Sequence, residues 1–163
     1  KQRQCRMHAQ SMDRRKLIQM TEEERRTFLA TARTAAFSTI DPWGYPHTVA
    51  MWFALDGDCV VMTTYAKSQK ARNVERNPKV AFMVEAGDTY DTLRGVLIRG
   101  RAELVHDVAY TVAVLKKVHE KMLGAIAPGI EEALERQAQK RVVVRIHPER
   151  VSSWDHRKLG GTY

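Results

Sequence analysis

The sequence lacks the features that mark several common protein classes. Its 163 residues include only two cysteines, Cys5 and Cys59, which are too few for a disulfide scaffold and form no Cys-x-x-Cys zinc pair. The longest apolar runs fall far short of the ~20 residues of a membrane span. No hydrophobic block follows the basic N-terminus, as one would in a secretory signal. We therefore expect a cytoplasmic protein with no membrane partner and a single domain.

The usual catalytic motifs are also missing. The six histidines form neither His-x-x-x-His nor His-Glu-x-x-His, and no serine lies in a Gly-x-Ser-x-Gly elbow. Gly-x-Gly-x-x-Gly and Walker-type sequences are absent, which excludes classical dinucleotide and P-loop sites. Cys59 lies in a predicted strand with no activating residue nearby in the sequence, and we interpret it as a small core residue. No metal site and no catalytic side chain is predicted, so the chain either uses a cofactor's chemistry or performs none.

Positive charge is abundant but unevenly placed. The net charge of +8 invites a nucleic-acid interpretation, but residues 1–16 carry +5 of it, segments 64–80 and 140–163 carry +4 each, and the rest sums to −5. Two compact basic segments in an otherwise acidic body favour a pocket for a small anion over a surface that binds a duplex. Residues 1–19 are predicted to be a mobile basic arm, and 20–163 the single domain.

Short strands joined by turn sequences dominate the chain. Asp41-Pro-Trp-Gly44 and Asp56-Gly57 are turn signals. Hydrophobic spacing and capping residues predict helices over 21–32, 68–77, 107–122 and 130–139, and strands over 34–40, 46–55, 59–64, 79–85, 96–105 and 142–146, followed by a tail over 148–163. This order predicts a mainly β protein, an antiparallel barrel with peripheral helices.

Two apolar patterns carry further expectations. The stripe along the 107–122 helix is interpreted as core. The strand over 46–55 is apolar on both faces, so both faces need cover. We expect a homodimer that buries this strand.

A phosphate site is suggested where the third strand ends. Thr63 and Thr64 close that strand, and Ser68 begins a helix that bears Lys70 in its first turn. Free backbone N–H groups, hydroxyls and a lysine are the groups that bind phosphate. On local chemistry alone, a solvated loop and an ordinary capped helix are slightly favoured over a phosphate site, because charged runs usually face water.

The order of motifs resembles a known superfamily. The run Pro42-Trp-Gly-Tyr-Pro-His-Thr-Val-Ala-Met-Trp-Phe53, the run Ser68-Gln-Lys-Ala-Arg-Asn-Val74, the strand Arg94-Gly-Val-Leu-Ile-Arg-Gly-Arg-Ala-Glu-Leu104 and the tail 148–158 resemble the pyridoxamine 5'-phosphate oxidase-like split-barrel superfamily. Its flavin/deazaflavin oxidoreductase branch, which uses FMN or coenzyme F420, is the most similar. The resemblance covers residues ~20–163 and implies a split β-barrel of the FMN-binding type. The Arg-x-x-Leu-Leu-Lys and Arg-Leu-Ala-Pro patterns of pyridoxamine phosphate oxidase itself are absent, which argues against vitamin B6 oxidation.

The resemblance also implies a cofactor site. Lys70 would bind the cofactor phosphate beside Ser68 and Asn73, the strand 47–52 would lie along the ring and ribityl chain, and the C-terminal residues would reach the partner's cofactor across a homodimer interface. The implied cofactor-binding residues are His47, Val49, Ala50, Met51, Trp52, Thr63, Thr64, Ser68, Lys70, Asn73, Trp154 and Lys158.

These expectations lead to a functional hypothesis. The leading one is an oxidoreductase that passes a hydride from reduced F420, or from a flavin, to a small organic substrate, with a proton from solvent or Tyr65. F420 is preferred because the basic turn at 64–80 suits a phosphate followed by an acidic tail. The alternatives are an FMN-dependent oxidase or reductase of the same fold, a non-enzymatic flavin or haem binder, and a nucleic-acid-binding protein that uses the arm at 1–16.

Overall fold

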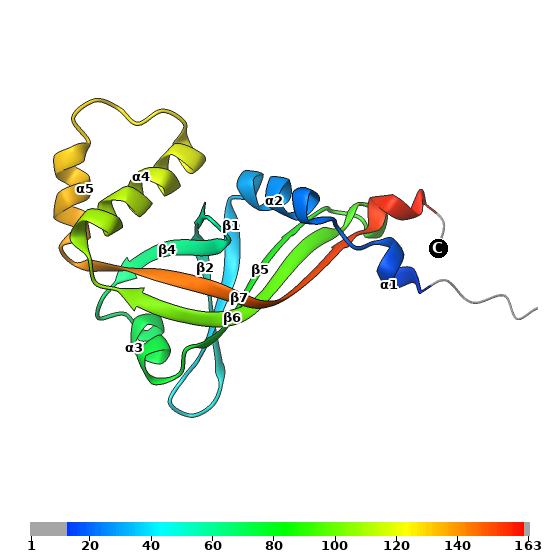
Figure 1. Cartoon of the computed structure of the whole chain (residues 1–163), viewed down its shortest axis with the longest axis horizontal. Helices are drawn as coiled ribbons and strands as arrows, with labels where there is room; N and C mark the ends of the chain where they lie inside the picture. Colours follow the sequence, from blue (N-terminus) through cyan, green and yellow to red (C-terminus); the bar gives the residue numbers. More distant parts are fainter. Residues whose placement is uncertain (1–12, 162–163) are drawn as a thin grey trace, which may run out of the picture.

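One seven-stranded antiparallel sheet forms the centre of the protein, in a computed structural model that describes residues 13–161 (Figure 1). Its strand order is β2-β1-β5-β6-β7-β4-β3, and every paired strand is antiparallel. The strands are β1 Thr34–Ile40, β2 Pro46–Trp52, β3 Ala54–Asp56, β4 Cys59–Tyr65, β5 Lys79–Ala86, β6 Arg94–Val105 and β7 Arg141–Asp155. The mainly β, antiparallel prediction is confirmed.

The helices begin where the sequence supplies capping residues. Thr21 and Glu24 form a capping box at one of them, Ser68 caps the next, and Asp107 caps the longest. The helices are α1 Arg14–Leu17, α2 Glu22–Thr31, α3 Gln69–Arg76, α4 Val108–Leu123 and α5 Glu131–Ala138, with short 3-10 helices η1 Tyr90–Thr92 and η2 His156–Leu159. Across residues 13–161, no helix has the length and apolar character needed to cross a membrane.

The sheet curls because its two edge strands are consecutive in the chain. β2 and β3 lie at opposite edges, yet only Phe53 separates them in the sequence. The prediction of one strand over 46–55 is therefore wrong: the chain leaves one edge at Trp52 and joins the other at Ala54. Phe53 has no exposed surface and packs edge-to-face on Phe82, with ring centroids 4.8 Å apart. This closure gives the split β-barrel that the sequence predicts.

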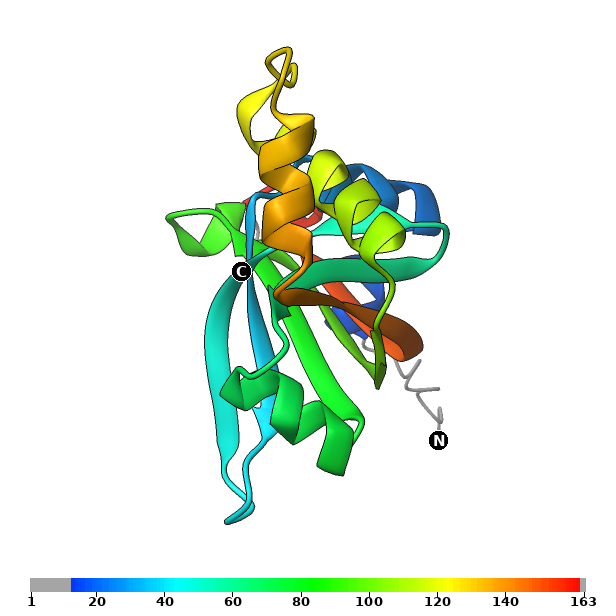
Figure 2. The ribbon, with the colours of Figure 1, turned by 90° about the vertical axis from the view of Figure 1, so that its left-hand side faces the viewer.

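The core lies inside the curl, and the helices lie outside it. Along β6, alternate residues from Val96 to Ala102 are buried and their neighbours from Arg99 to Glu103 are exposed, as predicted. α2 contributes Leu29 to the same core. α4 packs on the outer face of β4 and β7, and α5 packs against α4 (Figure 2).

The end of the chain is more regular than predicted. β7 continues through the predicted tail to Asp155, because the long strand β6 offers it a hydrogen-bonding partner over its whole length. The pairing shifts by one residue where Gly100 meets Pro148. A Cβ on Gly100 would lie 2.2 Å from the His147 carbonyl oxygen, so this bulge requires glycine.

The predicted arm over 1–19 lies mainly outside the described residues. Its last part, 13–19, forms α1 and a segment that contacts β7. The Ile18 carbonyl accepts a hydrogen bond from the backbone N–H of Asp155 at 2.7 Å, and the N–H of Met20 donates to the Ser153 hydroxyl at 3.1 Å. These residues therefore fold against the end of the last strand.

Candidate functional site

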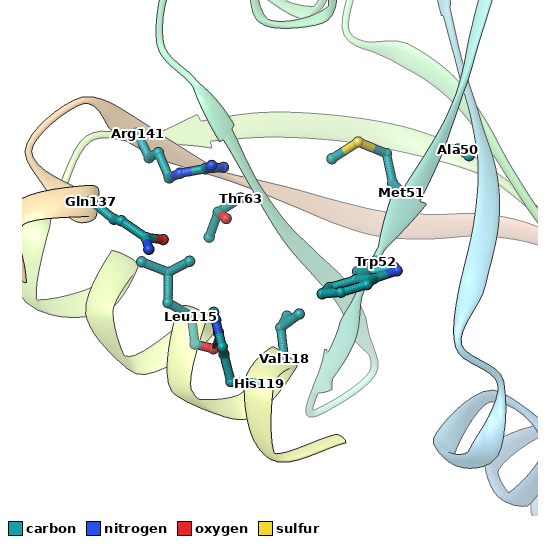
Figure 3. A pocket seen from close by; sticks show the side chains of 9 residues that line it. All are labelled: Ala50, Met51, Trp52, Thr63, Leu115, Val118, His119, Gln137 and Arg141. Atoms are coloured by element: carbon teal, nitrogen blue, oxygen red, sulfur yellow. Dashed lines mark hydrogen bonds between the residues drawn. The ribbon is translucent and has the colours of Figure 1, made fainter. Parts of the chain in front are cut away.

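A cavity of about 470 Å³ lies between β2 and β4 on one side and α4 and α5 on the other (Figure 3). It forms where β2 ends and the chain turns away at Phe53. Its lining residues are Ala50, Met51, Trp52, Thr63, Leu115, Val118, His119, Gln137 and Arg141. The first four are among the predicted site residues. A mostly apolar wall with a few polar groups along it is typical of a small-molecule site.

The side of the cavity built by α4, α5 and β7 was missed by the sequence analysis. Leu115 and Val118 are buried, as the core stripe predicts, but they also line the cavity, whereas Val108 of that stripe is exposed. His119 donates from Nδ1 to the Leu115 carbonyl at 2.8 Å, since a carbonyl only accepts. In the neutral ring Nε2 is then an acceptor. The only signal for this side was the basic segment 140–163, which includes Arg141.

Arg141 carries a positive charge without an acidic partner. Its guanidinium lies over the Tyr65 ring, 4.4 Å from the centroid, and its Nε is buried with no hydrogen-bond partner among the described residues. Within 13–161 it takes part in no ion pair. A buried N–H group without an acceptor is unfavourable in free energy, and a bound anion would supply the acceptor. Arg141 is therefore suited to bind an anion.

Lys70 lies close enough to Arg141 to be affected by its charge. Burial lowers the pKa of Lys70, and the positive charge of Arg141 lowers that pKa further. Ser68 caps α3 by accepting from the Ala71 N–H at 3.3 Å, and its hydroxyl lies 3.1 Å from that of Thr64. The structure thus brings together Thr64, Ser68 and Lys70, as predicted, and adds Arg141 to them.

A second basic cavity adjoins the first. It measures about 460 Å³ and shares Gln137 and Arg141 with the main cavity. Its other lining residues are Tyr65, Ala133, Arg136 and Lys140. Tyr65, predicted as a proton source, is 58% exposed and lines this second cavity instead of the main one.

Asn73 has a different environment from the one the resemblance implies. Its side chain has no exposed surface, and its amide donates to the Thr39 hydroxyl at 2.9 Å. Its amide oxygen accepts from Gln69 at 2.8 Å and from Arg76 at 3.1 Å. The bond to Thr39 holds α3 against β1, and the side chain of Asn73 is buried in this network.

The remaining predicted residues lie away from the main cavity of the same chain. His47 and Val49 are half-buried residues of β2, and the Nδ1 of His47 is buried without a partner among residues 13–161. Trp154 packs on Gly95, where a Cβ would meet the indole at 2.3 Å. Lys158 donates to Glu24 at 2.6 Å and to the Gln19 carbonyl at 2.7 Å. The end of β7 and the helix η2, which contain Trp154 and Lys158, lie at the end of the molecule opposite α4 and α5 (Figure 1).

The residues present fit an aromatic cofactor that carries phosphate. Trp52 and Met51 supply an aromatic ring and an apolar side chain to the cavity wall, and Lys70 and Arg141 are two cations that form no ion pair with any residue in the described range 13–161. The described part of the chain contains no group of three His, Cys, Asp or Glu side chains arranged to hold a metal ion. The site is therefore suited to an organic anion.

Comparisons with known proteins agree with this chemistry. Residues 21–155 match the family model described as pyridoxamine 5'-phosphate oxidase. The crystal structure of a conserved hypothetical protein from Mycobacterium tuberculosis is 43% identical, with a TM-score of 0.85 over 90% of this chain and 91% of that one. A solved structure named F420 reductase is 30% identical, with a TM-score of 0.64 over 81% of this chain and 98% of that one.

A curated relative points to the same branch. The 5a,11a-dehydrotetracycline/5a,11a-dehydrooxytetracycline reductase of Streptomyces rimosus is 26% identical over 134 residues, which are 78% of each chain. The resemblance read from the sequence motifs is thus confirmed over most of the chain. The chain belongs to the pyridoxamine 5'-phosphate oxidase-like split-barrel superfamily, a family that binds flavin or F420.

Proposed function

We propose that the protein is an F420-dependent oxidoreductase that transfers a hydride from the reduced deazaflavin to a small organic substrate. The observation that carries this proposal is Arg141 in the wall of an apolar cavity, with Lys70 near enough to be affected by its charge; neither cation has an acidic partner among residues 13–161. The second basic cavity, with Arg136 and Lys140, continues past Arg141. A cofactor with a phosphate and an acidic tail would use both the Lys70–Arg141 pair and the second basic cavity. FMN, which has no acidic tail, would use only the Lys70–Arg141 pair. The 30% identical F420 reductase supports the same choice.

The chain's own residues bind and orient the reactants. When bound, the cofactor supplies the hydride chemistry. Trp52 and Met51 support the ring, while Leu115 and Val118 keep water from it. The Nδ1 of His119 is held by the Leu115 carbonyl, so Nε2 is the ring nitrogen that remains to hydrogen-bond a reactant.

A cofactor titration tests the proposal. Purified protein is mixed with F420 or FMN, and ring fluorescence or tryptophan quenching is followed. We expect F420 to bind at low micromolar concentration or tighter, and FMN to bind at least tenfold more weakly because it leaves Arg136 and Lys140 unused. Tighter binding of FMN would favour the FMN-dependent alternative, and failure of F420 to bind at tens of micromolar would refute the proposal.

The competing binding functions are separated by two simple measurements. A haem carrier would show a Soret band after haem addition, with an affinity that excludes F420 from the same cavity. A nucleic-acid-binding protein that uses its N-terminal arm would lose its affinity when residues 1–16 are removed, whereas Lys70→Ala would leave that affinity unchanged. Under our proposal, Lys70→Ala weakens F420 binding, whereas removal of the arm leaves F420 binding unchanged.

We also propose that a second copy of the chain covers the outer face of β2. Thr48, Ala50 and Trp52 are exposed on that face, and Trp52 is 48% exposed. A shallow groove of about 510 Å³ runs beside them along β1 and β5 and is lined in part by Met83. A large apolar surface of this kind needs cover. In such a dimer, Trp154 and Lys158 would approach the partner's cofactor, since they lie far from their own chain's cavity.

Oligomeric state is measured by light scattering after gel filtration. We expect twice the chain mass of 18.7 kDa at micromolar concentration. Met83→Glu should shift the mass to that of one chain, because a carboxylate would be buried in the interface. Ala113→Glu, at an exposed position on α4, is the matched control. A wild-type mass of one chain would rule out the dimer.

A further inference from the structure

A thiol, an imidazole and a carboxylate lie in line on three neighbouring strands. Cys59 of β4 has its Sγ 3.5 Å from His147 Nδ1 on β7. The Nε2 of His147 lies 3.3 Å from Glu103 Oε1 on β6. Cys59 is buried, as expected of a core residue, and no activating residue lies near it in the sequence; the imidazole beside it comes from a position 88 residues away in the chain.

The contacts of His147 decide which of its nitrogens is the base. The Glu103 carboxylate lies 3.3 Å from Nε2 and favours the neutral form in which Nε2 carries the hydrogen, because a carboxylate attracts an N–H group and repels a lone pair. Nδ1 then presents its lone pair to Cys59, and the thiol donates its S–H to Nδ1. This is the arrangement in which an imidazole removes a proton from a thiol and a carboxylate holds the imidazole in place.

Charged side chains lie near Cys59 on this face of the sheet. A hydrogen bond with Cys59 is the largest of the causes that raise the pKa of Arg145. Asp56 pairs with Cys59 across β3 and β4, and its carboxylate contacts Tyr110 at 2.6 Å, Lys117 at 3.1 Å and Arg145 at 3.6 Å. Arg101 pairs with His147 across β6 and β7, and Asp58 directly precedes Cys59 in the chain.

The sulfur lies at the edge of the packed interior. Cys59 is 8% exposed, whereas the side chains of His147 and Glu103 are 49% and 54% exposed. Only a small neutral molecule could reach a sulfur buried to this degree, along the half-exposed imidazole ring. Cys59 and His147 line neither the main cavity nor the second basic cavity, so this cluster is separate from the proposed cofactor site.

We propose that Cys59 is a peroxide-reactive thiol for which His147 is the base and Glu103 is the positioning residue. The thiol proton passes to Nδ1 of His147, and the sulfur attacks one oxygen of hydrogen peroxide. The S–O bond forms as the O–O bond breaks, and the leaving hydroxide takes the proton from the imidazolium to become water. Sulfur is oxidised by two electrons to sulfenic acid, and the peroxide is reduced. This modification does not depend on the proposed F420 chemistry.

The experiment uses the Cys5→Ser protein, in which Cys59 is the only cysteine. The protein is exposed to hydrogen peroxide at pH 7, sulfenic acid is trapped with dimedone, and the modified peptide is quantified by mass spectrometry. An ordinary cysteine is only a few per cent thiolate at this pH, so activation by a base should raise the rate by about tenfold over that of the same chain unfolded in guanidinium chloride. A folded protein that reacts no faster than the unfolded chain overturns the proposal, because burial alone slows a thiol.

Two variants separate activation from exposure. His147→Gln should reduce the rate of the folded protein to or below that of the unfolded chain. Glu103→Gln keeps an acceptor for Nε2 but loses the charge that stabilises the imidazolium, so we expect a smaller loss and a shift of the pH–rate profile to higher pH. Arg99→Gln, on the same exposed face of β6, is the matched control and should react like the parent. Parent rates and an unchanged pH profile in both His147→Gln and Glu103→Gln would refute the mechanism.

Discussion

Lys70→Ala is the most direct test of the cofactor site. Lys70 lies in the first turn of α3, next to the Ser68 cap and under the influence of Arg141. In the structure, burial and the charge of Arg141 lower the pKa of Lys70, so its ammonium is held in an unfavourable environment. A bound phosphate would stabilise the Lys70 ammonium, because it places a negative charge beside it. Removal of the lysine should therefore weaken cofactor binding and leave folding nearly unchanged.

The size of the loss follows from the type of contact. A hydrogen bond to a charged group contributes about 1.5–3 kcal/mol. Since each 1.4 kcal/mol is a factor of ten in affinity, Lys70→Ala should weaken binding by about ten- to a hundredfold. Folding stability should change little or rise slightly, because the variant removes a cation that the folded state disfavours and that lies at the positive end of a helix.

The pH dependence of cofactor binding is a second test of the role of Lys70. Because the pKa of Lys70 is lowered, the free protein loses this charge at a lower pH than an ordinary lysine does. Affinity for a phosphate-bearing cofactor should therefore decline as the pH rises toward the usual lysine value of about 10.4. The Lys70→Ala protein should lack this decline, since the titrating group is gone.

The assay is a fluorescence titration of each variant with F420 and with FMN. Lys79→Ala is the control: Lys79 is an exposed residue at the start of β5, and its removal should change affinity by no more than about twofold. Arg141→Gln should weaken binding to a similar degree as Lys70→Ala. If the Lys70→Ala and Lys79→Ala proteins bind both cofactors as well as the wild type, the phosphate site is assigned incorrectly.

Three further predictions concern the scaffold. Phe53→Ala should lower the free energy of unfolding by about 3–5 kcal/mol in urea titrations, because Phe53 is fully buried at the point that joins the two sheet edges. Asp155→Asn should destabilise the protein at pH 7, because Arg157 holds the pKa of Asp155 below its usual value; the difference from the wild type should shrink as the pH falls below about 4, where the carboxylate becomes protonated. Gly95→Ala should cost about 1–3 kcal/mol and alter the near-ultraviolet circular dichroism of tryptophan, because the new methyl group displaces Trp154; an unchanged spectrum would contradict the contact.

Much of the fold could be predicted from local sequence signals. The Thr21 capping box, the Asp56-Gly57 turn and the alternation along 96–105 each act within a few residues, and each is found in the structure. The break at Phe53 was missed because its flanking residues are as apolar as strand residues. What ends β2 is the curvature of the whole sheet, which no short window of sequence contains.

The same distinction holds for the candidate site. Ser68, Lys70 and Thr64 were found because they lie within seven positions of one another in the sequence. Arg141 and His119 were missed because they belong to segments that reach the cavity only after folding. The spacing of residues in the sequence therefore predicts contacts between residues a few positions apart. It does not predict contacts between segments that are far apart in the sequence.

The structure divides the site into two parts that can be changed separately. Thr64, Ser68 and Lys70 belong to the connection between β4 and α3, where the hydroxyl and ammonium groups of the anion site gather. The opposite wall comes from the α4–α5 pair, which is inserted between β6 and β7 and packs outside the barrel through its own apolar contacts. Changes on the cavity side of that pair, such as at His119, need not disturb the barrel or the anion site. We therefore expect the β4–α3 connection to determine cofactor affinity, and the α4–α5 pair to determine which substrate is accepted.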